Sequence, residues 1–257
     1  MFRVFGIQLS VHASFALLLV YEAFAGWMEG GRAGLGYQVL LVLLFFVCVV
    51  LHELGHSLTA RRYGVQVPRI LLMPIGGMAE FDRIPREPRA ELLITFAGPA
   101  VNFVIFGLML PFYWSTVFGD KAFEEFSLLG VGTLLTGANL VMGIFNLLPV
   151  YPMDGGRVLR AILAKKFPYI DATRYAVTVT RFLAPILAAG ALMLFVRSPS
   201  PGPAILSVLF VFIFLAGNAE YRLLVRRERE AAYWAELARR MNEAAAEPPL
   251  LQQHGPN

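Results

Sequence analysis

The sequence predicts an all-α membrane protein with six transmembrane helices and a short membrane-associated β element after the second helix. Two observations lead to this class. Of the 257 residues, 57% are apolar and 16% are charged, whereas soluble domains contain roughly 45 to 50% and about 25%. The apolar residues also form long stretches without charge. These features exclude an ordinary soluble enzyme and a disordered chain, and the lone Cys48 excludes a disulfide-stapled secreted domain.

Six stretches are long and apolar enough to be membrane spans, because about 20 helical residues cross a hydrocarbon core of about 30 Å. Four of them carry no charge, while the first contains Glu22 and the fifth contains Arg181. The spans are expected at residues 9–27, 36–51, 92–118, 126–153, 176–196 and 203–219. The lipid bilayer is therefore the expected surroundings of the chain, in a multi-pass arrangement in the cell membrane.

The basic residues predict how these spans are oriented. With six spans, 19 of the 22 Lys and Arg residues fall on one side of the membrane. The positive-inside rule places that side, and with it both termini, in the cytoplasm. The same asymmetry accounts for the net charge of +4 without a nucleic-acid partner.

Two segments depart from the pattern of apolar helices. Residues 64–81 are rich in β-forming residues and are broken by prolines and by Gly76-Gly77, which indicates a short hairpin or a re-entrant loop. After Tyr221 the composition changes to Arg, Glu and Ala, with Trp234 and Met241 at helical spacing. We therefore expect a six-span domain over residues 1–220 and a cytoplasmic amphipathic tail over residues 221–257.

The second span ends in the sequence His52-Glu53-Leu54-Gly55-His56. A helical turn places the two imidazoles on one face with Glu53 beside them. Two such histidines can bind one Zn²⁺, and the carboxylate can take a proton from an attacking water. Three ionisable side chains within five residues at membrane depth indicate a functional site.

A catalytic zinc site needs a third protein ligand, and Asp154 is a candidate. It follows Pro149 and Pro152, which interrupt a regular helix and suggest that this segment lines a cavity. Spacing alone leaves two interpretations open: Asp154 is a metal ligand, or it caps a helix that begins near Arg157.

Four motifs resemble the site-2 protease family of intramembrane zinc metalloproteases. They are His-Glu-Leu-Gly-His at 52–56, Pro-Ile-Gly-Gly at 74–77, Ala-Gly-Pro-Ala-Val-Asn at 97–102, and the segment from Asn146 to Gly156. The resemblance covers roughly residues 1–220. It is to the compact six-helix prokaryotic branch, because the sequence has no PDZ-like insertion between its spans and no CBS-like domain after them.

The resemblance implies a role for each matching residue. His52, His56 and Asp154 would bind one Zn²⁺ per chain, Glu53 would be the general base, and Asn146 would assist at the substrate carbonyl. Gly76, Gly77 and Asn102 are assigned to substrate binding, the glycines through strand addition. The alternative for Asn102 is an interhelical hydrogen bond.

The expected activity is hydrolysis of peptide bonds in or near the transmembrane segments of other membrane proteins, as in regulated intramembrane proteolysis. The active site would lie nearer the cytoplasmic face, where Arg61 and Arg62 follow the metal helix. Control would come from a regulatory membrane protein or from earlier trimming of the substrate. Two alternatives are a prenyl-protein endopeptidase completed by a downstream Glu, and a metal transporter or catalytically silent relative.

Overall fold

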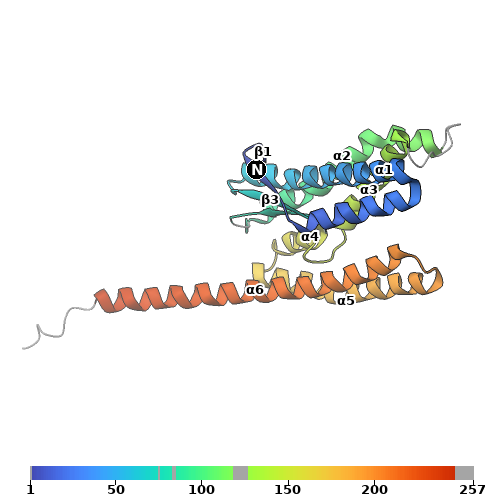
Figure 1. The fold of residues 1–257 in the computed structure, drawn as a ribbon. Coiled ribbons are helices and arrows are strands. Elements are labelled where there is room, and N and C mark those ends of the chain that lie inside the picture. Colours follow the sequence, from blue (N-terminus) through green and yellow to red (C-terminus); the bar gives the residue numbers. More distant parts are fainter. Residues whose placement is uncertain (1, 75, 83–84, 118–126, 247–257) are drawn as a thin grey trace, which may run out of the picture. The chain divides into compact units, whose positions relative to one another are not determined.

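The computed structural model describes residues 2–74, 76–82, 85–117 and 127–246 (Figure 1). Five helices in this described part are long and apolar enough to cross a membrane. The elements follow one another in the order β1 (Phe2–Val4), β2 (Ile7–Val11), α1 (Ser14–Arg62), β3 (Arg69–Met73), β4 (Gly76–Glu80), α2 (Pro88–Val117), α3 (Leu128–Asn146), α4 (Asp154–Leu163), α5 (Tyr169–Arg197) and α6 (Pro201–Ala246). The expected span ends at Phe118 and Phe126, and residues 247–257 of the expected tail, lie outside the described residues.

Helix α1 contains the first two expected spans. Its helical geometry breaks at Gly30 and Gly31, and Gly31 has a φ of 59°, which favours glycine. The chain turns back there, as Figure 1 shows. The two halves pair antiparallel: Phe15 packs against Phe46 with ring centroids 4.6 Å apart. Because α1 contains two of the six expected apolar segments, the described part of the chain has five long apolar helices.

The predicted start of the first span, near Leu9, is wrong. Residues Ile7–Val11 form strand β2, and α1 begins only at Ser14. Strand β2 pairs in parallel with β3, matching Leu9 to Ile70. Because its partner lies some 60 residues further along the chain, this strand has no local signal that distinguishes it from the start of an apolar helix.

The sheet has four strands in the order β1-β2-β3-β4, so the predicted β element is larger than expected. Strands β3 and β4 form the expected hairpin, with Met73 paired to Gly76 and Arg69 to Glu80. Strand β4 is at the edge of the described sheet.

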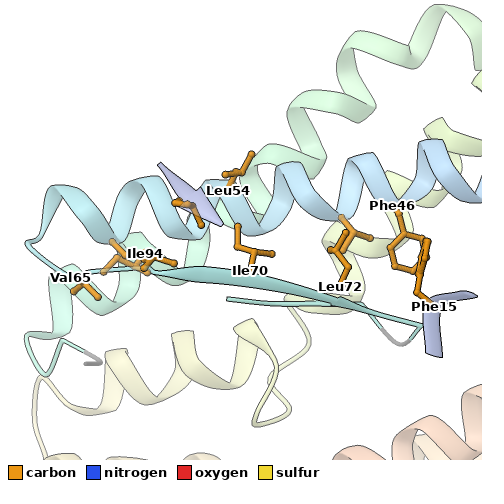
Figure 2. Packing of buried hydrophobic residues seen from close by; sticks show 11 residues of the cluster. Phe15, Phe46, Leu54, Val65, Ile70, Leu72 and Ile94 are labelled. Carbon is orange, nitrogen blue, oxygen red and sulfur yellow. The ribbon is translucent and has the colours of Figure 1, made fainter. Parts of the chain in front are cut away.

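One face of the sheet packs against the second half of α1. Ile70 and Leu72 of β3 point toward α1 in Figure 2, in a buried cluster that also contains Leu54 and Ile94. Ile70 is fully buried. This apolar packing holds the β3–β4 hairpin beside the part of α1 that carries His52 and His56.

Helices α2 and α3 complete the surroundings of α1. Helix α2 packs against both α1 and α3. Helix α3 starts at an N-cap formed by Ser127, whose side chain accepts a hydrogen bond from the Gly130 amide at 3.0 Å. It ends at Asn146, seven residues earlier than the expected apolar run, because Pro149 and Pro152 cannot continue it. The chain then enters α4 at Asp154.

The chain divides into two compact units, residues 1–183 and 184–257. In the second unit the end of α5 is linked to α6 by a hydrogen bond from Ser207 Oγ to the Ala188 carbonyl at 3.0 Å. Helix α6 continues without a break from Pro201 to Ala246. Residues 222–246 are thus a direct extension of the last expected span.

Candidate metal centre

His52 and His56 lie one turn apart on the second half of α1, and both side chains are buried. Their rings are 4.7 Å apart between centroids. Asp154, the first residue of α4, comes to the same point from a part of the chain about 100 residues away. These three residues form a group that can bind a metal ion.

The ligand atoms form a nearly equilateral triangle. The two Nε2 atoms of the histidines are 3.1 Å apart, and Asp154 Oδ2 lies 3.4 Å from His52 Nε2 and 3.2 Å from His56 Nε2. Tetrahedral zinc with ligand bonds of about 2.0 to 2.1 Å separates its ligands by about 3.3 Å. The residues present therefore fit a zinc ion with three protein ligands and a fourth position open.

Each imidazole is held by a hydrogen bond at its other nitrogen. His52 Nδ1 lies 2.6 Å from Asn102 Oδ1, and His56 Nδ1 lies 2.8 Å from the Ile94 carbonyl. Both partners are on α2. The carbonyl accepts a hydrogen bond only from a protonated Nδ1, so the His56 Nε2 lone pair is left for a metal.

Asp154 also supplies an atom that lacks an ordinary partner. Among the described residues, its Oδ2 is buried and accepts no hydrogen bond. A buried carboxylate oxygen without a hydrogen-bond partner is costly unless a cation lies beside it. The capping interpretation is wrong: α4 already begins at Asp154, Met153 occupies the N-cap position, and no side chain among the described residues caps this helix. Asp154 instead belongs to the group that can bind a metal ion.

A cavity of about 240 Å³ opens beside the three ligand atoms. Glu53, Asn146 and Gly77 line it together with His52, His56 and Asp154. The structure thus brings together six of the eight expected site residues in one place. Gly76 begins β4 with a φ of 136° and is not among the lining residues described for this cavity.

The Asn102 side chain does not reach the cavity, contrary to its assignment to substrate binding. It is fully buried and lies between two other side chains, at 2.6 Å from His52 and 3.0 Å from Asn139. The alternative, an interhelical hydrogen bond, describes this arrangement. Asn102 accordingly contacts the imidazole of a candidate metal ligand and is not among the residues that line the cavity.

Two glycines allow the close packing around the centre. A Cβ at Gly98 would overlap the His56 imidazole, so α2 can approach α1 only without a side chain there. A Cβ at Gly77 would lie 2.6 Å from Glu53 Cγ, so β4 lies directly against the Glu53 side chain.

At the far end of β4, a hydrogen bond from Arg69 lowers the pKa of the Glu80 carboxyl.

An ion pair that the sequence reasoning missed lies on the wall of the same cavity. Arg160 of α4 donates from Nε to Glu91 Oε1 of α2 at 2.7 Å, and from Nη1 to the Tyr151 hydroxyl at 2.8 Å. Both charged side chains are at most 3% exposed. Removing one partner of such a pair costs about 3 to 5 kcal/mol. The pair holds the helix of Asp154 against the helix that supports both histidines.

Comparison with known proteins decides the family. The family model described as Peptidase family M50 matches residues 40–136 and 121–187. The solved structure of a site-2 protease from Methanocaldococcus jannaschii is 35% identical, with a TM-score of 0.60 over 86% of this chain and 94% of that one. The chain belongs to peptidase family M50. The expected resemblance to site-2 proteases is thus confirmed.

Relatives in peptidase family M50 include proteins longer than this chain. A zinc metalloprotease of Methanocaldococcus jannaschii is 43% identical over 187 residues, which are 73% of this chain and 52% of that protein. Stage IV sporulation protein FB of Bacillus subtilis is 31% identical over 199 residues, or 76% of this chain and 64% of that protein. The chain thus spans about half to two thirds of the length of these two relatives.

Proposed function

We propose that this family M50 chain is an intramembrane zinc metalloprotease that hydrolyses peptide bonds in or near the transmembrane segments of membrane proteins. One observation carries the proposal: the triangle of ligand atoms from His52, His56 and Asp154 has the dimensions of a zinc site and lies beside Glu53 in a cavity. The zinc metalloproteases among its relatives support the same activity. The biological process would be regulated intramembrane proteolysis.

His52, His56 and Asp154 would hold one zinc ion per chain, which when bound supplies a Lewis acid that polarises the scissile carbonyl and acidifies water. The Glu53 carboxylate accepts the proton of the attacking water and passes it to the leaving amide nitrogen. Asn146 lines the same cavity at the end of α3. Its Nδ2 can donate a hydrogen bond to the substrate carbonyl oxygen, where negative charge develops.

The outer edge of β4 is suited to binding an extended substrate. In an antiparallel hairpin, successive residues direct their backbone groups alternately to the partner strand and away from it. Counting from the closing pair of Met73 and Gly76, the groups of Gly77 and Ala79 point away from β3. Both residues line the cavity. A substrate segment paired there would have its own helix unwound, which exposes the peptide bond to water.

The proposed position in the membrane follows from the helices and the charges. The five long apolar helices and the family support a multi-pass membrane protein. We place both termini in the cytoplasm and the active site nearer that face, since Arg61 and Arg62 end the metal helix. Membrane-protein substrates would then be cut close to the cytoplasmic surface, and a regulatory membrane protein is the proposed control.

The two alternatives have less support. A prenyl-protein endopeptidase would complete its zinc site with a downstream Glu, whereas the third ligand atom here belongs to Asp154. A transporter would need metal-binding groups along several spans. In the part of the chain that the structure describes, one cluster of metal-binding side chains is found.

A comparison of four purified proteins tests the proposal. Wild type should contain about one zinc per chain by elemental analysis and should cleave a single-span model substrate in detergent. Glu53→Gln should keep the zinc and lose at least about a hundredfold of the cleavage rate, because only the general base is removed. Asp154→Ala should lose the zinc. Glu22→Gln, which changes another carboxylate of α1, should retain both properties.

Two results would contradict the proposal. Wild type without zinc after reconstitution would show that the three ligand atoms do not form the site. Full cleavage by Glu53→Gln would show that another group accepts the proton.

A further inference from the structure

A chain of three hydrogen bonds leads from α3 to the imidazole of His52. Asn139 Nδ2 donates to the Leu135 carbonyl at 2.9 Å, and Asn102 Nδ2 donates to Asn139 Oδ1 at 3.0 Å. The third link joins His52 Nδ1 to Asn102 Oδ1 at 2.6 Å. The two asparagines are fully buried, and His52 is 6% exposed. Three helices therefore contribute to the orientation of one candidate ligand.

The direction of every bond in this chain is set at its α3 end. A backbone carbonyl only accepts hydrogen bonds, so Asn139 must turn its nitrogen toward Leu135. Its oxygen then faces Asn102, which must present its nitrogen and keep its own oxygen for His52. Asn102 Oδ1 can only accept, so the proton of His52 is placed on Nδ1 and the lone pair on Nε2.

Reversing either amide would be unfavourable. It would bring two oxygens, or two amide NH2 groups, together at about 3 Å. A buried polar group left unpaired costs about 1 to 3 kcal/mol. The Leu135 carbonyl therefore selects one state of an imidazole that it does not touch.

We propose that Asn139 is a positioning residue of the metal centre, which selects the metal-binding form of His52 through Asn102. The inference rests on the proposed function, since it requires that His52 bind zinc through Nε2. It also gives α3 two contributions to the site: Asn139 orients a ligand, and Asn146, two turns further along the same helix, lines the cavity.

Zinc affinity of the full-length protein in detergent is the direct test. Asn139→Leu removes the carbonyl oxygen and the NH2 group of this side chain while keeping a similar volume. Asn102 then loses the partner that orients it. We expect the dissociation constant for zinc, measured by competition with a chromophoric chelator, to rise about tenfold. This is the low end of the range of about 10 to 100 for partners of metal ligands.

A second substitution distinguishes orientation from mere packing. The double variant combines Asn102→Asp with Asn139→Leu. Both oxygens of an ionised carboxylate accept hydrogen bonds, so the Asp side chain can accept one from His52 Nδ1–H in either orientation, without a partner on α3. We expect the double variant to bind zinc within about twofold of wild type, although both asparagines are gone. A loss of affinity caused only by loosened helix packing would persist in this variant and would overturn the inference.

Thr136→Val provides a matched control on the same helix. Thr136 is fully buried in α3 and donates hydrogen bonds to the carbonyls of Met109 of α2 and Gly132. It has no link to His52 among the described contacts. This variant should lower the melting temperature of the zinc-free protein and leave the dissociation constant for zinc unchanged.

The remaining outcomes separate the two proposals. If wild type binds zinc and Asn139→Leu binds it equally well, the role of Asn139 is wrong and the proposed function stands. An equal loss of affinity in Thr136→Val would also overturn the inference, since any buried polar bond of α3 would then have this effect. If wild type itself binds no zinc, the metal centre and the role of Asn139 fail together.

Discussion

At Gly98 the backbone of α2 lies so close to the His56 imidazole that a Cβ there would overlap the ring. The candidate metal centre therefore depends on a missing side chain as well as on its proposed ligands. The same helix supplies the Ile94 carbonyl, which lies 2.8 Å from His56 Nδ1. Closeness is needed for this contact, because a hydrogen bond loses most of its strength beyond about 3.5 Å. The close packing of α2 against α1 therefore determines both the room available to the His56 ring and its hydrogen bond to Ile94.

Gly98→Ala should displace His56 and empty the site. The added Cβ would overlap His56 Nε2, so either the α2 backbone or the buried imidazole must shift. We expect the zinc content of the purified variant to fall well below half an atom per chain by elemental analysis. Gly107→Ala is the matched control, because nothing lies within 4 Å of a Cβ there and the residue is on the same helix. Normal zinc content in Gly98→Ala would refute this account of the packing.

Among the elements, the edge strand β4 lies between the candidate metal centre and the proposed binding place of the substrate. It packs against α1 on one side through Gly77 and pairs with β3 along one edge. Its other edge is the one that carries the outward backbone groups of Gly77 and Ala79. An edge strand that a protein leaves open offers a template for pairing with another chain. In this protein the edge is adjacent to Glu53, where such pairing would serve catalysis.

Ala79→Pro should weaken substrate binding without harming the metal centre. Proline removes one outward N–H group, which takes no part in the pairing with β3. One hydrogen bond of about 0.5 to 1.5 kcal/mol corresponds to a rise in KM of about two- to twelvefold, with a smaller change in kcat. Kinetics on a single-span substrate, with zinc content as a second readout, would measure this. Ala79→Val keeps the N–H and should behave as wild type. An unchanged KM in the proline variant would argue against strand addition.

At the scale of the whole molecule, α6 is longer than a membrane is thick. Its 46 residues extend about 69 Å at 1.5 Å per residue, against a hydrocarbon core of about 30 Å. Most of its charged residues lie in the second half, with exposed pairs such as Arg240 and Glu236 at 2.8 Å. We propose residues 1–220 as the protease domain and residues 221–257 as a cytoplasmic tail that continues the last span.

A chain shortened after Glu220 tests this division. All the residues that form the candidate metal centre precede that point. We expect the shortened protein to contain about one zinc per chain and to cleave a single-span substrate at a rate within about threefold of wild type, since exposed surface pairs contribute only about 0 to 1 kcal/mol each. Loss of zinc would place part of the protease domain in the tail.

Much of the fold and part of the site could be read from local sequence. The long apolar stretches determine the helices, because each needs only its own residues to satisfy its backbone in a bilayer. The spacing of His52 and His56 is also a local signal, because residues four positions apart lie on the same face of a helix. The break at Pro149 and Pro152 is likewise local.

Other features were decided only by the tertiary structure. Strand β2 forms because β3, distant in the chain, lies beside it. Asp154 both begins a helix and faces the histidines, and only the packing of α4 against α2 brings it there. Asn102 and Asn139 are 37 residues apart, and Asn102 is 50 residues from His52. Periodicity is a property of neighbouring residues, whereas these contacts require helices to meet, so their chemistry depends on packing that no short segment encodes.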